Sequence, residues 1–371
     1  MAADMPAPAE VPASAPSAPL TGARPPGGRR RASPPAAGAI AISAPRPAAP
    51  ARVASASGAA TAPSRRGEGG ADRRPAFEPA TALAPAKVNL HLHVLGRRED
   101  GLHLLESLTV FPDVCDVVTA RPAPPGVFSI EVAGPFAAGA PADASNLALR
   151  AAIALAEAVG QGPAAEAPLG VALTLEKTLP AAGGIGGGSA DAAAVLRLMN
   201  RLWSLDLPLE RLSEIGLSLG ADLPVCLHAP APAWMAGIGE RVSAVSGVPP
   251  LAILLANPGT PTPTPEVFRR LRHRDGAPAA WPAEGCPGLD ALVGWLSDTS
   301  NMLEPPAREV APAVSGLLQT IAAQPGCRLA RMSGSGATCF GIFETMAGAE
   351  AGAQALRRAG LWAAAGRSAG A

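Results

Sequence analysis

The chain has 371 residues, a formal net charge of zero and 48% hydrophobic residues, enough for two domains that each bury a core. This charge balance provides no basic face for nucleic acid, and proline, glycine or charged residues interrupt every apolar run before the roughly 18 residues that a membrane-spanning helix needs. The five cysteines lie apart without a Cys-x-x-Cys pair, which argues against a zinc site and a disulfide framework. We therefore expect a soluble, cytoplasmic protein without a dedicated metal site.

Residues 1–80 differ in composition from the rest of the chain. They are rich in Ala, Pro, Gly, Ser and Arg, and their ten arginines exceed their five acidic residues, which leaves a net charge of −5 for the remainder. Such a segment cannot bury enough apolar surface to offset its ordering entropy, so we expect a disordered extension. A transit peptide, a dispensable extension and an overlong start are the alternatives, although acidic residues dilute the transit-peptide pattern.

The first predicted domain comprises residues 81–249. It begins with a strand over Lys87–Leu95, in which polar and apolar residues alternate, and a polar turn over Arg97–Gly101. Further apolar periodicities predict strands near 107–111, 127–132 and 171–175, and helices near 146–159, 191–203 and 209–220.

The second predicted domain comprises residues 250–371. It opens with a buried-strand pattern over Leu251–Leu255, and a glycine-rich turn over Met332–Ala337 leads into a strand over Thr338–Phe343. Helices and strands are mixed in both halves, and we see no internal repeat. The sequence therefore predicts an α+β fold.

A glycine-rich loop lies between a predicted strand and a predicted helix. Glycine tolerates positive φ and leaves backbone N–H groups accessible, and a following helix directs its positive end at the same point. A flexible linker is the alternative, but a linker is not expected between a strand pattern and a helix pattern. We predict a phosphate-binding loop formed by Pro180, Ala181, Ala182, Gly183, Gly184, Ile185, Gly186, Gly187, Gly188 and Ser189.

This loop matches neither of the common nucleotide-binding motifs. A P-loop needs lysine and then serine or threonine after its second anchoring glycine, whereas Ser189 and Ala190 follow Gly188. A dinucleotide-binding fingerprint needs a third glycine where Ser189 stands. A lysine that neutralises phosphate must therefore come from another segment.

Three other segments carry residues suited to phosphoryl transfer. Lys87 and Asn89 lie two apart on a predicted strand and so project from one face. Asp222 stands among apolar residues at the end of a helix, and Gly334–Ala337 forms a second glycine turn. Taken singly, each has an ordinary explanation: a solvated lysine, a helix cap and a tight turn.

Together and in this order, these segments resemble the GHMP kinase family. The resemblance covers about residues 84–343, and the Gly96–His103 motif, which is not general to the family, narrows it to members that act on a cytidine diphosphate conjugate. The motifs that carry it are Ala86-Lys-Val-Asn-Leu90, Gly96-Arg-Arg-Glu-Asp-Gly-Leu-His103, Gly186-Gly-Gly-Ser-Ala-Asp-Ala-Ala193, Gly220-Ala-Asp-Leu-Pro224, Gly237-Ile-Gly-Glu240 and Met332-Ser-Gly-Ser-Gly-Ala337.

The resemblance implies a fold and an activity. The fold is a two-domain GHMP kinase fold, with an N-terminal domain like ribosomal protein S5 domain 2, a C-terminal ferredoxin-like domain and an active site in the cleft between them. The activity is ATP-dependent phosphorylation of a hydroxyl on the methylerythritol moiety of a cytidine diphosphate conjugate, in non-mevalonate isoprenoid synthesis. ATP is the phosphoryl donor, and because no carboxylate cluster appears, we expect Mg²⁺ to be held mainly by phosphates and water.

The resemblance also assigns roles to residues. Lys87 and Asp222 are the catalytic pair, and Gly183–Ser189 hold the ATP phosphates. Trp234 stands where the family carries an aromatic residue that stacks on cytosine. Because Leu102 stands where the family usually has tyrosine, Trp234 alone is expected to stack on cytosine; Ala190 replaces a serine. The residues assigned to the substrate site are Asn89, His103, Trp234, Thr264, Gly334, Ser335 and Gly336.

Positioning and charge neutralisation dominate phosphoryl transfer, so we expect Lys87 to neutralise phosphate and Asp222 to orient the hydroxyl and accept its proton late.

Another GHMP kinase, such as homoserine or mevalonate kinase, and a catalytically silent nucleotide-binding protein are the alternatives. We expect a small-molecule substrate, no nucleic-acid or membrane partner, and a monomer or weak homodimer. His91 and His93 share a strand face, and packing or substrate lining is favoured over metal binding.

Overall fold

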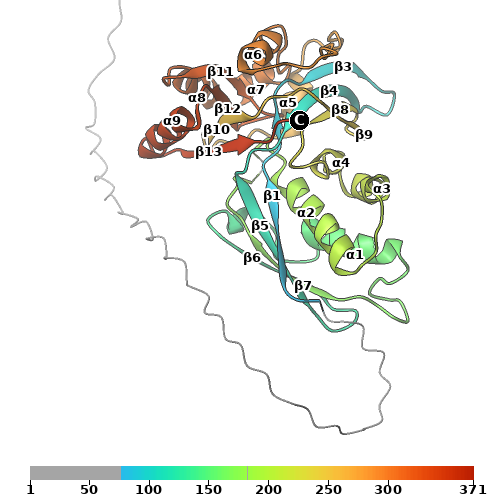
Figure 1. Cartoon of the computed structure of the whole chain (residues 1–371). Helices are drawn as coiled ribbons and strands as arrows, with labels where there is room; N and C mark the ends of the chain where they lie inside the picture. The colour runs from blue at the N-terminus through green and yellow to red at the C-terminus, as the bar shows by residue number, and fades with distance from the viewer. Residues whose placement is uncertain (1–76, 182) are drawn as a thin grey trace, which may run out of the picture. The chain divides into compact units, whose positions relative to one another are not determined.

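The computed structural model describes residues 77–371 except Ala182, and all of these belong to one compact unit (Figure 1). The prediction for residues 1–80 falls almost entirely outside the described residues. Regular structure begins at Ala80, one residue before the predicted start at Thr81. No helix in the described part of the chain is both long and apolar enough to cross a bilayer.

The first sheet and three helices form an α/β layer that carries the predicted phosphate loop. The strand order is β1-β5-β7-β6, with β6 and β7 parallel and the other pairs antiparallel. The helices lie alongside this sheet (Figure 1). The elements are β1 (Ala80–Pro85), β5 (Cys115–Pro122), β6 (Phe128–Ala133), β7 (Val171–Glu176), α1 (Leu147–Ala158), α2 (Gly187–Leu202) and α3 (Leu209–Leu219).

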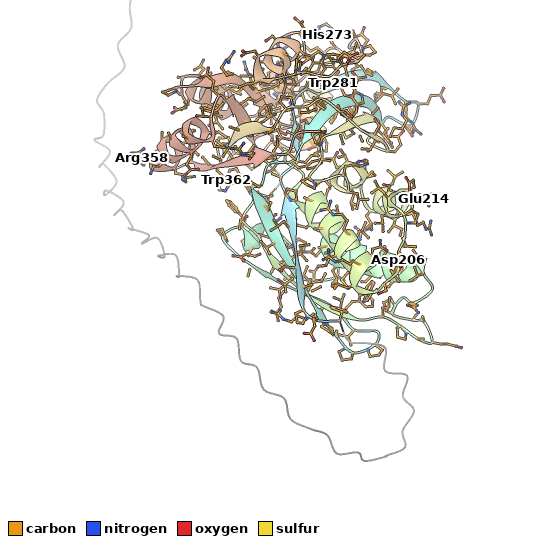
Figure 2. The ribbon with its side chains drawn as sticks, viewed as in Figure 1. Asp206, Glu214, His273, Trp281, Arg358 and Trp362 are labelled. Carbon is orange, nitrogen blue, oxygen red and sulfur yellow. The ribbon has the colours of Figure 1, made fainter. Side chains whose placement is uncertain are left out.

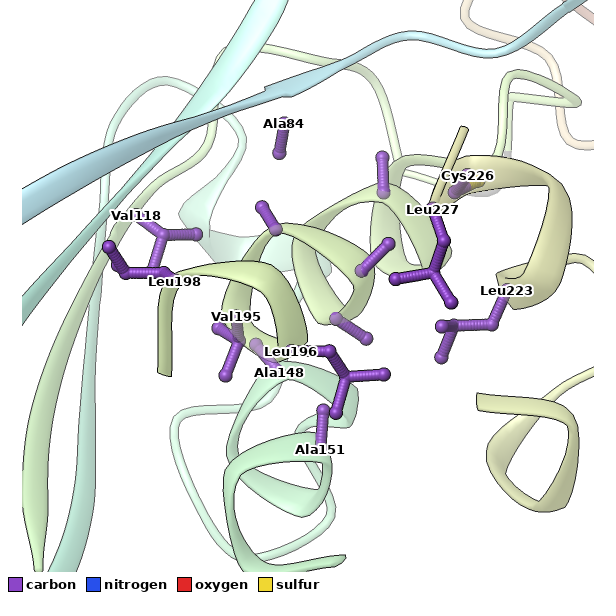
Figure 3. Packing of buried hydrophobic residues seen from close by; sticks show 14 of the residues in the cluster. Ala84, Val118, Ala148, Ala151, Val195, Leu196, Leu198, Leu223, Cys226 and Leu227 are labelled. Atoms are coloured by element: carbon purple, nitrogen blue, oxygen red, sulfur yellow. The ribbon is translucent and has the colours of Figure 1, made fainter. Parts of the chain in front are cut away.

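Small side chains let α1 and α2 pack closely. Polar residues such as Asp206 and Glu214 lie at the surface, whereas alanine and leucine fill the space between helices and sheet (Figures 2 and 3). Asn146 caps α1 by accepting a hydrogen bond from the Ala148 N–H at 2.9 Å. Helix α2 begins at Gly187, inside the glycine run, so the start predicted near residue 191 is wrong.

The second sheet begins with the strand directly after Lys87. Its strand order is β2-β4-β8-β9, with β3 also paired to β4. The single strand predicted over Lys87–Leu95 is wrong, because the His91 ring Nδ1 accepts the Leu108 N–H at 3.1 Å and interrupts the backbone ladder. The strands are β2 (Val88–Asn89), β3 (His93–Arg97), β4 (His103–Val110), β8 (Ala233–Gly237) and β9 (Arg241–Ala244).

The third sheet confirms the predicted ferredoxin-like C-terminal half. All its strand pairs are antiparallel in the order β11-β12-β10-β13, and α8 and α9 pack on it in a β-α-β-β-α-β succession. The elements are β10 (Leu251–Asn257), α8 (Ala313–Ala322), β11 (Cys327–Met332), β12 (Cys339–Phe343), α9 (Met346–Arg358) and β13 (Trp362–Ser368).

A buried hydrophobic cluster joins the two halves. Val88 and Leu108 of the second sheet belong to the same cluster as Leu255 and Phe340 of the third. The α+β fold of two halves is confirmed, whereas the boundary at residue 250 stays a prediction because the described residues form one unit. The remaining helices are α4 (Leu223–Cys226), α5 (Thr264–Arg270), α6 (Leu289–Ser297) and α7 (Glu304–Val310).

Candidate active site

A cleft of about 1010 Å³ brings together most of the residues that the sequence singled out. Its walls come from β2, the glycine loop, the segment before α4, the proline-rich start of α5 and the second glycine turn. The predicted residues that line it are Lys87, Asn89, His103, Gly184, Gly186, Ser189, Asp222, Thr264, Gly334 and Ser335.

Lys87 and Asp222 form an ion pair in this cleft. The Lys87 Nζ lies 2.9 Å from the Asp222 Oδ2, and the two side chains are 4% and 47% exposed. The Lys87 N–H donates to the Ile185 carbonyl at 2.9 Å. A Cβ on Gly186 would lie 3.3 Å from the lysine stem, so this glycine leaves room for the stem. The buried lysine is thus held at the phosphate loop, while the carboxylate faces solvent.

Asp222 is at the N-cap position of α4, yet its side chain makes no capping hydrogen bond. Its ordinary explanation as a helix cap therefore fails. The carboxylate instead pairs with Lys87 and lines the cleft.

The glycine loop presents unblocked helix N–H groups. Gly186 is the N-cap of the 16-residue helix α2, has φ of +64°, and supplies no side chain to cap the first turn. Gly184 also has a positive φ of +74°, which favours glycine. A Cβ at Gly188 would contact nothing within 4 Å, so an anion can approach the backbone there.

The other predicted loop residues have different surroundings. Pro180 and Ala181 line a neighbouring hollow of about 340 Å³, not the main cleft. The Ile185 side chain is fully buried in the hydrophobic cluster between the halves, so only its backbone can meet a ligand. Gly187 faces Lys177 and Asp116 behind the loop. Ala182 lies outside the described residues.

The second glycine turn supports the loop from the C-terminal half. The Ser333 hydroxyl donates to the Gly184 carbonyl at 3.2 Å and accepts the Asn89 N–H at 3.1 Å. The Thr338 N–H donates to the Gly183 carbonyl at 2.9 Å. Gly336 does not line the cleft, because it lies against Gly184 and Met332. Sequence motifs contain Ser333, but its bridging role needs the structure.

Three predicted substrate residues offer polar groups to the cleft. The Asn89 Oδ1 and His103 Nε2 atoms are buried without a hydrogen-bond partner among the described residues. Burial, and then the charges of Arg274 and Arg97, lower the pKa of His103, which keeps the ring neutral near pH 7. Thr264 is hydrogen-bonded to Ser335, with 2.7 Å between their hydroxyl oxygens.

Trp234 does not lie in the cleft, so its predicted stacking on cytosine is not supported. Side chains alternate along β8, and Met235 is the neighbour that faces the cleft. The Trp234 ring instead contacts those of His91 and Trp295, with centroids 5.1 and 6.2 Å away.

Phe268 is the aromatic residue in the cleft, and the sequence reasoning missed it. Its ring stacks on His103 with centroids 4.6 Å apart and an interplanar angle of 24°. Helical spacing offered a signal, since Phe268 lies four residues after Thr264 and therefore on the same face of α5.

Comparisons with known proteins agree with this geometry. The chain matches the family models "GHMP kinases N terminal domain" over residues 146–229 and "GHMP kinases C terminal" over residues 286–360. It is 52% identical over 266 residues to a 4-diphosphocytidyl-2-C-methyl-D-erythritol kinase of Brucella melitensis, covering 71% of this chain and 86% of the relative. A relative of the same name from Cereibacter sphaeroides is 48% identical over 292 residues, with 78% and 99% covered. The chain belongs to the 4-diphosphocytidyl-2-C-methyl-D-erythritol kinase family.

Solved structures agree with this membership. A crystal structure named 4-(cytidine 5'-diphospho)-2C-methyl-D-erythritol kinase is 36% identical, has a TM-score of 0.64, and covers 79% of this chain and 100% of its own. A homoserine kinase from Cytophaga hutchinsonii has a TM-score of 0.53 at 16% identity, covering 78% and 94%, and shows the shared fold alone. The chain is therefore a kinase of the GHMP type.

A histidine pair outside the kinase cleft raises the question of a metal. His91, His93 and Glu106 place one ligand atom each within 4.8 Å of one another. The Leu108 N–H occupies the His91 Nδ1, so the proton of this neutral ring stands on Nε2 and blocks metal binding there. Burial lowers the pKa of His91 to about 3, which keeps the ring neutral. These contacts favour the packing interpretation.

Proposed function

We propose that this protein transfers the γ-phosphoryl group of ATP to the 2-hydroxyl of 4-diphosphocytidyl-2-C-methyl-D-erythritol, giving the 2-phosphate and ADP in the non-mevalonate isoprenoid pathway. The observation that carries this proposal is the Lys87–Asp222 pair beside the open N-terminus of α2 in one large cleft. The relative that is 52% identical and is named 4-diphosphocytidyl-2-C-methyl-D-erythritol kinase supports the choice of substrate.

The glycine loop and Lys87 bind the triphosphate. The N–H groups at the start of α2 and its helix dipole attract the phosphate oxygens, and the Ser189 hydroxyl adds a donor. The Lys87 ammonium, held at the loop by its own backbone bond to Ile185, neutralises charge that spreads over the transferring group. Because both are fixed in advance, little reorganisation is needed.

Asp222 orients the acceptor hydroxyl. The hydroxyl oxygen forms the new bond to the γ-phosphorus, the bond from that phosphorus to the β–γ bridging oxygen breaks, and ADP leaves with that electron pair. The Asp222 carboxylate accepts the hydroxyl proton late in the transfer, while its partner Lys87 stays on the phosphate side.

The cleft fits a magnesium ion held chiefly by the nucleotide. Asp222 is the only carboxylate among the described residues that line it, and the Ser189 hydroxyl is a further oxygen donor near the loop. Such a sparse oxygen set is typical of Mg²⁺, which keeps several waters and binds substrate phosphates. When bound, Mg²⁺ neutralises phosphate charge.

We infer that the cytosine binds at Phe268 and His103. Phe268 offers an aromatic face, the unpaired Nε2 of His103 can hydrogen-bond a base edge, and the 48%-exposed Leu102 adds an apolar contact at the cleft mouth. Leu102 cannot stack as tyrosine does, so Phe268 supplies the stacking surface.

An assay of ATP turnover on a panel of GHMP-kinase substrates tests the function. The cytidine diphosphate conjugate should be phosphorylated, while homoserine and mevalonate should not raise ADP release above the level without acceptor. Equal turnover of all acceptors would contradict the substrate assignment. If no acceptor increases ADP release, the result would favour the alternative, a nucleotide-binding protein without kinase activity.

A pair of aromatic substitutions tests the cytosine site. Phe268→Ala should raise the KM for the cytidine substrate about tenfold or more while the KM for ATP stays near wild type, because base stacking contributes about 1–3 kcal/mol. Trp234→Ala is the matched control and should leave the ratio of the two KM values unchanged. The opposite pattern would restore the sequence-based assignment to Trp234.

The cytoplasmic location and the monomer or weak dimer stay predictions.

A further inference from the structure

A buried ionic cluster lies directly behind the phosphate loop. The Lys177 Nζ contacts the Asp116 Oδ2 and lies 2.7 Å from the Asp191 Oδ2. The three residues are 3%, 0% and 3% exposed, respectively, and none lines the main cleft. A Cβ on Gly187 would lie 3.4 Å from the Lys177 Nζ, so the cluster contacts the back of the glycine backbone.

One part of the cluster fixes the segment that enters the loop. The Asp116 Oδ1 accepts hydrogen bonds from the Thr178 N–H at 2.6 Å and the Leu179 N–H at 2.9 Å. Asp116 itself belongs to β5, a paired strand of the first sheet. The last residues before Pro180 are thereby tied to a rigid element.

The other part fixes the segment that leaves the loop. Asp191 stands in the first turns of α2, and its bond to Lys177 ties the start of this helix to the end of β7. Residues 180–190 therefore run between two anchors that share one lysine.

The charge balance of the cluster indicates more than a stabilising ion pair. Two carboxylates share one ammonium, and the Asp191 Oδ1 is buried without a hydrogen-bond partner among the described residues. Burial raises the pKa of Asp191, since the attraction of Lys177 does not fully compensate it. Buried charges of this kind are a poor source of stability and concentrate at functional sites.

We propose that Asp116, Lys177 and Asp191 are positioning residues that clamp both ends of the phosphate loop and pre-organise it for ATP. The clamp holds the N–H groups of the loop in the arrangement that phosphate needs, so ordering is complete before the nucleotide arrives. This role rests on the loop being the ATP site of the proposed function.

If Asp191 acted only through the electrostatic effect of its charge, its removal would change ATP affinity in the opposite direction. Above its raised pKa of about 7, Asp191 carries negative charge behind a polyanion site, so at such a pH its removal should tighten ATP binding if charge alone mattered. If the clamp matters, the same removal loosens the loop and weakens binding. The direction of the change in affinity therefore separates the two explanations.

The test measures the Kd of a non-hydrolysable ATP analogue by calorimetry for Asp191→Ala and Asp191→Asn. We expect Asp191→Ala to raise this Kd about tenfold, equivalent to about 1.4 kcal/mol of loop ordering returned to the binding step. The Kd of Asp191→Asn should lie between those of wild type and Asp191→Ala, about threefold above wild type, because its amide oxygen can still accept a hydrogen bond from Lys177. The Kd of the cytidine substrate should stay within about twofold for both.

Ile321→Ala provides the control for lost stability. Ile321 is fully buried on α8 in the hydrophobic cluster of the C-terminal half, away from the loop. It should lower the Tm without changing the analogue Kd. An unchanged or lower analogue Kd for Asp191→Ala would overturn the proposal.

Hydrogen exchange of the loop keeps the test decisive if Asp191→Ala does not fold. Amides of residues 183–188 should exchange faster in Asp191→Asn than in wild type, and equal rates would overturn the clamp. Both measurements use binding or exchange and no turnover. An inactive wild type would therefore refute the proposed substrate while leaving the clamp testable.

Discussion

The chain contains two lysines, Lys87 and Lys177, and they lie on opposite sides of the same glycine loop. Lys87 packs against Gly186, and Lys177 approaches Gly187, the next residue. Both lysines pair with aspartate, but the partner of Lys87 is 47% exposed, whereas the partners of Lys177 are almost fully buried.

The different solvent exposure of the aspartates gives these two sites different chemical properties. Asp222 can exchange Lys87 for a substrate hydroxyl because water and ligands reach it. Asp116 and Asp191 meet only protein, so their bonds can hold the backbone but cannot take part in transfer. A lysine suits both sites, because its narrow stem and compact ammonium fit beside a glycine backbone where a planar guanidinium is broader.

The largest expected effect is on kcat, and it distinguishes the Lys87–Asp222 site from the buried cluster. Asp222→Asn should lower kcat by about 10²–10⁴-fold, since it removes the proposed proton acceptor of the transfer step. Single-turnover measurement with saturating substrates checks this. Asp206→Asn makes the same chemical change on the surface, at a φ of 50° that asparagine tolerates, and should leave kcat unchanged (Figure 2). Wild-type turnover by Asp222→Asn would refute its role.

The same substitution at the two lysines distinguishes the sites by stability. Lys177→Met leaves two buried carboxylates without a cation and should lower the free energy of unfolding by about 3–5 kcal/mol. Lys87→Met leaves a half-exposed carboxylate that water can solvate, and should cost about 1 kcal/mol or less. Denaturant titration of both variants measures the difference. Equal losses would show that burial does not separate the two sites.

The pH dependence of stability tests the buried cluster by a separate measurement. Burial raises the pKa of Asp191 from 3.8 to about 7. The folded state thus keeps a proton that the unfolded state releases, so the contribution present below pH 3.8 is lost as pH rises towards 7. Wild type should lose stability relative to Asp191→Asn over this range, by at most about 1.4 kcal/mol per pH unit. Parallel curves for the two proteins would contradict this.

The sequence predicted what local pattern and motif encode. The α+β fold, most helices and strands, the glycine loop before a helix and the pairing of Lys87 with Asp222 all follow from periodicity or from motif order, whereas phosphate binding by the loop stays a prediction. Errors arose where tertiary contacts decide. The His91 ring interrupts a strand, and α2 starts within the glycine run. The orientation of β8 leaves Trp234 outside the cleft, so its stacking on cytosine stays a prediction.

The residues missed by sequence reasoning depend on long-range pairing. Asp116 and Asp191 are 61 and 14 residues from Lys177 in the chain, and no spacing rule joins them. Phe268 reaches His103 only because α5 and β4 meet at the cleft. Composition and periodicity describe one segment at a time and do not contain these contacts.

The scarcity of lysine makes the two sites separately visible by spectroscopy. Isotope-labelled lysine introduced into this chain would give one side-chain signal from Lys87 in the cleft and one from Lys177 in the buried cluster, with no third lysine to overlap them. A nucleotide titration would then follow both faces of the same glycine loop at once, with each resonance reporting on its own side.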